Sequence, residues 1–199
     1  SMPDVGYIVA SGSLPPGVPE DIFARIADIA REKAAKLILD TSGEPLRLAL
    51  EEGVFLIKPN LRELSFLAGN IPLTGDNVWK QGHLLIEQHK AQVVVVSMGE
   101  KGAWLIKKDS RQLITPPPAE KKSTVGAGDS MVAGIVWMLS QHSSLKEAVE
   151  YGVACGTAAT LKAGTELCSK QDADRFYQQI GYHKSEVVVT SSTDTHYPV

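Results

Sequence analysis

Short apolar runs alternate along the chain with longer amphipathic stretches. Four of the runs are almost uninterrupted in Ile, Leu and Val, which is typical of parallel strands that are covered on both faces. A shorter run follows the fourth after a Gly-containing turn. We therefore expect strands at residues 5–13, 35–43, 53–60, 91–99 and 102–108.

The stretches between these runs have helical periodicity. Residues 19–34 place Ile22, Ile26 and Ile29 on one face, with acidic residues near the start. Residues 77–90 show a similar pattern, which Gly82 weakens. Because strands and helices alternate at this spacing, the sequence predicts βαβ units and a parallel sheet.

The pattern changes after residue 108. Residues 109–122 are turn-rich and then proline-rich, so we expect a loop over the sheet edge, followed by helices at 128–141, 145–162 and 171–180. Residues 184–199 are rich in Ser and Thr and lack a packing pattern. We expect one nucleotide-binding α/β domain over residues 1–183 and a flexible tail over 184–199.

Composition narrows the function classes. The chain has 199 residues, 43% of them hydrophobic, and a formal net charge of −3, so it can bury a core and offers no basic face for nucleic acid. No apolar run is long enough to cross a membrane, and no signal peptide is recognisable, so we expect a cytoplasmic protein. Cys155 and Cys168 match no metal or redox spacing, which favours two idle thiols over a disulfide.

Small and polar residues follow four of the expected strands. Ligands of open α/β sheets bind at the carboxyl ends of the strands, so these residues are candidates for a binding site. The chain has neither a GxxxxGK[ST] motif nor a GxGxxG motif directly after a strand. If the chain binds phosphate, it must therefore do so through a different motif.

Gly126, Ala127, Gly128 and Asp129 stand where a charged loop meets an apolar helix. The glycines let a ligand approach closely, and the exposed N–H groups of a helix start can bind an anion. Asp129 could then accept a proton from an attacking hydroxyl. It could equally serve only to favour the helix N-terminus electrostatically, and the spacing alone supports both interpretations.

The segment STVGAGDSMVAG (123–134) resembles the carboxyl-terminal signature of the PfkB (ribokinase-like) sugar kinase family. The resemblance covers essentially residues 5–180. Within the family, the sequence is most similar to the minor-type ATP-dependent 6-phosphofructokinase branch, and next to the branch of 1-phosphofructokinases and tagatose-6-phosphate kinases. It implies a three-layer ribokinase-like (Rossmann-like) α/β fold with a mostly parallel sheet. Further matches in the family's order are SGSLPPGVP (11–19), KPNLRE (58–63), VVVVSMGEKGA (93–103), PPPAEKKSTVGAGDS (116–130) and GTAATLKAGTELCS (156–169).

The resemblance implies an ATP-dependent kinase that phosphorylates an alcohol group of a sugar phosphate. Asp129 would be the catalytic base, and Gly126, Ala127 and Gly128 would form the anion hole. Asn60 and Glu63 match the family's NxxE motif, which would organise Mg²⁺ through water, although an isolated Asn-x-x-Glu is more often a helix cap. Lys58 would face the nucleotide phosphates.

Further matches concern the nucleotide and the sugar. Ser97, Gly99 and Gly102 match the nucleotide loop, and Lys121 matches its rim, where a solvated lysine is nearly as well supported. Val153 and Thr157 would flank the adenine, with core packing as the alternative. Ser13, together with Asp129, would contact the sugar phosphate.

Some members of the family also bind a monovalent cation, K⁺, through backbone carbonyls. The positions that match this site are Ser123, Val125, Ala159 and Gly164. Two departures weaken the match: many relatives have Asp where Ser123 stands, and Lys162 brings a positive charge where related phosphofructokinases are neutral.

The first third of the family's length has no counterpart in the chain. That third carries the β-sheet lid, which contacts the sugar and forms the usual homodimer in the family. We expect an unpaired sheet edge with exposed apolar surface nearby. Three hypotheses follow: a kinase fragment with little activity alone, a non-catalytic nucleotide-binding module, and an interaction module that uses the open edge. Intact Asn60, Glu63 and Asp129 favour the first.

Overall fold

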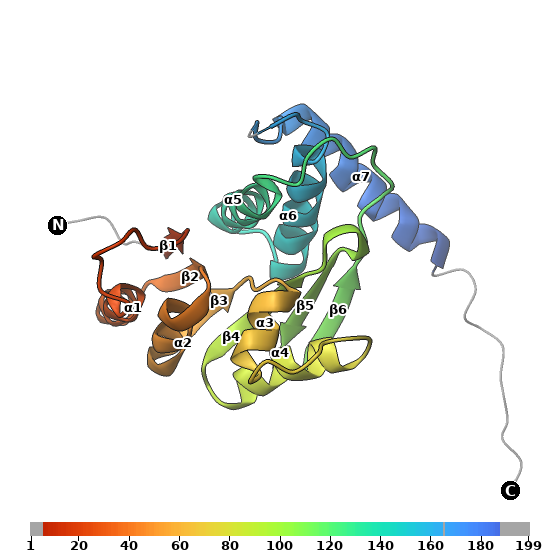
Figure 1. The fold of residues 1–199 in the computed structure, drawn as a ribbon. Helices are drawn as coiled ribbons and strands as arrows, with labels where there is room; N and C mark the ends of the chain where they lie inside the picture. The colour runs from red at the N-terminus through yellow and green to blue at the C-terminus, as the bar shows by residue number, and fades with distance from the viewer. Residues whose placement is uncertain (1–5, 165, 188–199) are drawn as a thin grey trace, which may run out of the picture.

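The sheet follows the order of the sequence from one edge to the other. The computed structural model describes residues 6–164 and 166–187, in which the strand order is β1-β2-β3-β4-β5-β6 (Figure 1). Strands β1 to β4 are parallel, as predicted, whereas β5 and β6 are each antiparallel to the preceding strand. The bounds are β1 Tyr7–Ser11, β2 Lys36–Asp40, β3 Val54–Ile57, β4 Ala91–Ser97, β5 Ala103–Lys107 and β6 Ser110–Ile114.

Helices cover both faces of the sheet (Figure 1). Helices α1 to α4 pack on one face, and α5 to α7 pack on the other. In the described part of the chain, none of the helices has the length and apolar character to cross a bilayer. The bounds are α1 Ile22–Glu32, α2 Gly43–Glu52, α3 Leu61–Leu67, α4 Asn77–Glu87, α5 Ala127–Ser140, α6 Leu145–Ala159 and α7 Lys170–Val187, with a 3₁₀ turn at Gly99–Lys101.

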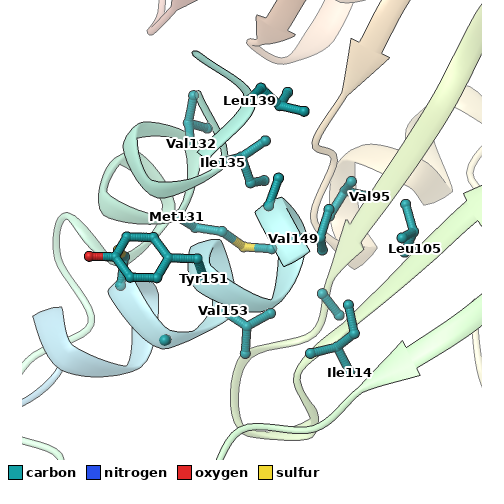
Figure 2. Close-up of a cluster of buried hydrophobic side chains, with 14 of the residues drawn as sticks. Val95, Leu105, Ile114, Met131, Val132, Ile135, Leu139, Val149, Tyr151 and Val153 are labelled. Carbon is teal, nitrogen blue, oxygen red and sulfur yellow. The ribbon is translucent and has the colours of Figure 1, made fainter. Parts of the chain in front are cut away.

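Alternate residues of the central strands supply two separate cores. Val93 and Val95 of β4 pack under α5 and α6, whereas Val94 and Val96 pack against the α1–α4 layer. Figure 2 shows Val95 opposite side chains of α5 and α6 in the first of these cores. The near-continuous valines of β4 are therefore explained by burial on both faces.

The sequence-based expectation of a loop over residues 109–122 was wrong in its first part. Residues Ser110–Ile114 form β6, which pairs with β5 through a tight hairpin. Ile114 is the one buried residue of β6. The sequence of this segment therefore lacks the alternation of apolar and polar residues that would predict a strand. Helices α2 and α3, which are short, were also not predicted.

Helix α7 is longer than the expected helix at 171–180. It runs from Lys170 to Val187, so residues 184–187 of the expected tail are helical. Residues 188–199 lie outside the described residues. Gly82, which weakened the helix prediction at 77–90, lies in α4 where a Cβ atom would be 2.5 Å from Ile106 Cδ1. The absence of a side chain lets α4 approach the sheet closely.

The expected unpaired sheet edge is β1. Among the described residues it pairs with β2 alone. Beside it, Val9 of β1 and Trp137 of α5 keep 43% and 52% of their surface exposed. The hollow that Val9 and Trp137 line extends along α5 to Asp129 in the first turn of that helix, which is discussed below.

Candidate phosphoryl-transfer site

The first turn of α5 presents free backbone donors. Gly126 precedes the helix with φ 74°, a left-handed conformation that glycine adopts without strain, and its carbonyl accepts from the Ser130 N–H at 2.9 Å. The N–H groups of Gly128 and Asp129 have no acceptor anywhere in residues 6–164 or 166–187. Free N–H groups at a helix start, reinforced by the helix dipole, form an anion-binding site.

One side of this turn is closed in. A pocket of about 530 Å³ lies between the turn after β4, the proline segment after β6, and helices α5 and α6; it is partly open to solvent and is called the enclosed pocket below because it has walls on several sides. Eight of the residues proposed from the sequence line it: Ser97, Gly99, Gly102, Lys121, Ala127, Gly128, Val153 and Thr157. The sequence did not indicate that Pro116–Pro118, Thr124, Met131 and Gly156 also contribute.

Gly102 fixes one wall of the enclosed pocket. Its φ is 85°, and a Cβ atom at this position would lie 1.9 Å from the carbonyl oxygen of Ile114. Only glycine lets the turn after β4 meet the end of β6. Val153 lines the pocket and is also buried in the core, so the ligand and packing interpretations of this residue are compatible.

Lys58 lies between the sheet and the anion-binding turn. The side chain is buried, and its Nζ is 3.2 Å from Asp40 Oδ1 at the end of β2. The same Nζ is 3.5 Å from the position that a Cβ of Gly128 would occupy. A buried ammonium therefore stands directly beside the free donors of α5.

Asp40 was not singled out in the sequence, although its place at the carboxyl end of β2 could have indicated it. Burial raises the pKa of Asp40, while the ammonium of Lys58 counteracts the rise. The negative charges of Glu63 and Asp129 also raise it. The charges of Lys58, Glu63 and Asp129 therefore all act on the carboxyl group of Asp40.

Asn60 and Glu63 form the capping box of α3. Asn60 Oδ1 accepts from the Glu63 N–H at 2.9 Å, and Glu63 Oε2 accepts from the Asn60 N–H at 2.9 Å. The backbone of Asn60 also forms an isolated parallel β-bridge with Ser97, so the start of α3 lies against the wall of the enclosed pocket. Glu63 Oε1 has no partner in the part of the chain described, and such an oxygen suits a hydrated Mg²⁺ ion.

Asp129 faces the other side of the α5 turn. It is exposed, and in the described residues its carboxylate has no hydrogen bond or ion pair. It lies at an open hollow, which is lined by Val9, Ser11, Asp129, Val132, Ala133, Val136, Trp137 and Ser140. Ser13 follows in the exposed loop after β1 and lines neither hollow.

Three residues proposed for a monovalent cation gather around one hydroxyl. Ser123 Oγ donates to the Gly164 carbonyl at 3.0 Å and accepts from the Val125 N–H at 3.2 Å. The carbonyl of Ala159, the fourth, accepts from the Lys162 N–H at 3.1 Å. The ammonium of Lys162 is paired with Asp172 at 3.3 Å, so its charge is balanced within the chain.

Comparison with known proteins identifies the family. Residues 2–172 match the domain described as the pfkB family carbohydrate kinase. The chain belongs to this family. The three-layer ribokinase-like fold expected from the resemblance is confirmed by solved structures of similar proteins.

The relatives are longer than this chain. It is 42% identical over 171 residues to the ATP-dependent 6-phosphofructokinase isozyme 2 of Escherichia coli, covering 85% of this chain and 55% of the relative. It is 39% identical over 174 residues to the 1-phosphofructokinase of Borreliella burgdorferi, covering 87% and 55%. A crystal structure of E. coli phosphofructokinase-2 in complex with potassium is 40% identical and superposes with a TM-score of 0.85, covering 89% of this chain and 58% of that one. The chain therefore spans about half the length of these relatives.

Proposed function

We propose that this chain supplies the nucleotide-binding and phosphoryl-transfer half of an ATP-dependent sugar-phosphate kinase. The observation that carries the proposal is the position of the α5 turn. Its free N–H groups and Lys58 adjoin the enclosed pocket, and Asp129 faces the open hollow next to them. ATP would occupy the enclosed pocket, and the sugar hydroxyl would approach from the open hollow.

Each group has a role that follows from its surroundings. Asp129, which has no partner in the described chain, accepts the proton of the attacking hydroxyl. The N–H groups of Gly126, Ala127 and Gly128 would stabilise the charge that develops on the transferred phosphoryl group, and the Ala127 N–H, which donates to the Thr124 carbonyl at 3.4 Å, would have to exchange that acceptor for the phosphate. Lys58 contributes a positive charge that Asp40 holds in place.

Metal ions would complete the charge balance. Asn60 and Glu63 would hold Mg²⁺ through water, and the ion would neutralise negative charge on the phosphates. K⁺ would be held by the backbone carbonyls of Val125, Ala159 and Gly164 beside Ser123. The E. coli relative that was crystallised with potassium supports this part of the proposal.

Fructose 6-phosphate is the acceptor that we propose, because the relative at 42% identity is a 6-phosphofructokinase. The relative at 39% identity makes fructose 1-phosphate kinase chemistry the alternative. Because the described residues supply the open hollow with no wall beyond β1 and α5, we propose that the chain alone has little activity. We also propose that the kinase is cytoplasmic and dimerises through a lid outside these residues.

Calorimetric titration with ATP–Mg²⁺ tests the nucleotide side. We expect the chain to bind, and Asp129→Asn to retain its affinity within about twofold, because Asp129 faces the other hollow. In a form that carries the full length of the relatives, the same substitution should lower kcat with fructose 6-phosphate by about 10²–10⁴-fold, the usual contribution of a general base. Ser140→Ala, in the same hollow, is the matched control. Unchanged turnover after Asp129→Asn would rule out the proposed base.

A further inference from the structure

The enclosed pocket has a phosphate end, and the rest of its lining is mostly apolar. The phosphate end is the α5 turn, where the free N–H of Gly128 lies beside the ammonium of Lys58. With a triphosphate at this turn, the ribose and base of a nucleotide must extend between α6 and the proline segment. The polar side chains that line the pocket are those of Ser97, Glu100, Lys121, Thr124, Thr157 and Thr160. Their contacts decide whether the pocket can read the hydrogen-bonding pattern of a base.

Two of these side chains belong to the phosphate end. Thr124 leads into the α5 turn, and its carbonyl accepts from the Ala127 N–H at 3.4 Å. Ser97 is the last residue of β4, and its backbone forms the β-bridge with Asn60, one of the two residues proposed to hold Mg²⁺. Neither side chain therefore lies where the base would be.

Two other side chains use their hydroxyl protons within the chain. Thr157 Oγ1 donates to the Val153 carbonyl at 2.8 Å, and Thr160 Oγ1 donates to the Thr157 carbonyl at 2.7 Å. A hydroxyl group has one proton, so in this arrangement both side chains can only accept from a ligand. The face of α6 in the pocket therefore offers a base no side-chain donor among the described residues.

The remaining two side chains pair with each other at the mouth of the pocket. Lys121 and Glu100 form an ion pair, in which the Glu100 side chain is 80% exposed and that of Lys121 is 34% exposed. The pair contains a donor and an acceptor, both close to solvent. It can therefore serve a base of either hydrogen-bonding pattern and favours neither.

The wall opposite α6 is poor in free donors. Proline has no backbone N–H, so Pro116–Pro118 present only carbonyl oxygens, and the next N–H along the chain belongs to Ala119. In the adjoining turn, the Gly102 N–H donates to the Gly99 carbonyl at 3.0 Å, and the Gly102 carbonyl accepts from the Met98 N–H at 2.8 Å. A base in this part of the pocket is held mainly by apolar surface.

We propose that the enclosed pocket binds purine nucleoside triphosphates as a class, ATP, ITP and GTP alike, through apolar contact with the base. This inference rests on the function proposed above, because it places the triphosphate at the α5 turn. Adenine carries a donor at position 6, where guanine and hypoxanthine carry an acceptor. A site that hydrogen-bonds such a group rejects analogues without it by about 10⁴–10⁵-fold, whereas an apolar pocket separates close analogues far less.

Calorimetric titration of the chain with the Mg²⁺ complexes of ATP, ITP, GTP and CTP tests the proposal. We expect ITP and GTP to bind within about tenfold of ATP. CTP should bind more weakly than all three, because its smaller ring buries less apolar surface. ITP separates the exchange at position 6 from the additional amino group of guanine. A loss of more than about tenfold with ITP or GTP would overturn the proposal. CTP binding as tight as that of ATP would also overturn it, because the base would then contribute nothing.

Two variants examine the side chains that could still read the base. Thr157→Val removes a hydroxyl without changing the shape of the side chain, and Lys121→Met removes the donor at the mouth. Each should change the ratio of ATP affinity to GTP affinity by no more than about twofold, and a larger change would show that the side chain selects the base.

The pattern of binding separates this inference from the function on which it rests. Tight binding of ATP with rejection of ITP and GTP would keep the proposed function and refute only the breadth of the nucleotide class. Failure of every triphosphate to bind would refute both.

Discussion

The two sides of the α5 turn differ in how completely the chain builds them. The enclosed pocket has walls from the turn after β4, the proline segment and two helices, all within the described residues. Among the residues that the structure describes, the open hollow is lined only by the edge strand β1 and one face of α5, and Val9 and Trp137 remain exposed there. Gly128 lines the first and the neighbouring Asp129 lines the second.

This difference separates phosphate handling from acceptor recognition. A nucleotide side that is built from one continuous stretch of chain can bind its ligand by itself, whereas an acceptor side with one wall cannot exclude water around a transferring phosphoryl group. Relatives that are nearly twice as long have additional chain that could supply the second wall. Mutations on the two sides should therefore have unequal effects on stability and nucleotide affinity.

Gly102→Ala should have the largest effect. The new Cβ would collide with the Ile114 carbonyl, and the left-handed backbone adds strain, so we expect a loss of about 3 kcal/mol in the free energy of unfolding. Urea denaturation measures it. Gly99→Ala, which has positive φ but open space around its Cβ, is the control and should cost about 1 kcal/mol. Equal losses for the two variants would show that the wall of the enclosed pocket is more adaptable than this geometry allows.

Lys58→Met should affect the nucleotide side next. It removes a buried positive charge beside the α5 donors, and we expect ATP–Mg²⁺ affinity to fall by about thirtyfold, the usual loss for a charged hydrogen bond. Lys121→Met is the control, because Lys121 is partly exposed and pairs with the exposed Glu100. Its affinity should change only about twofold. A larger loss at Lys121 than at Lys58 in calorimetry would place the main phosphate contact at the rim instead.

Trp137→Gln should have the smallest effect and tests the open side. Half of this side chain is exposed in the described structure, so the substitution should change the free energy of unfolding by no more than about 0.5 kcal/mol. Ile135→Val, two residues earlier but buried, should cost about 1 kcal/mol by the same urea measurement. A substantial loss at Trp137 would mean that the hollow is already covered in solution.

Much of the fold could be predicted because its signals are local. The valine run of β4 indicated a strand buried on both faces, and residues 19–34 and 77–90 each contain a helix. Strand β6 was missed because only Ile114 of its residues faces the core, and pairing with β5 rather than apolar alternation defines it.

The sequence by itself determined the family, the parallel α/β layers and the candidate residues of the α5 turn, because each of these depends on short motifs and on periodic burial. Only the tertiary structure decided that Gly128 and Asp129 line different hollows, that Asp40 holds Lys58 beside the anion-binding turn, and that Asn60 lies against Ser97 at the end of β4. These are relations between side chains on different strands and helices. Their distances follow from sheet register and helix packing, which no local stretch of sequence encodes.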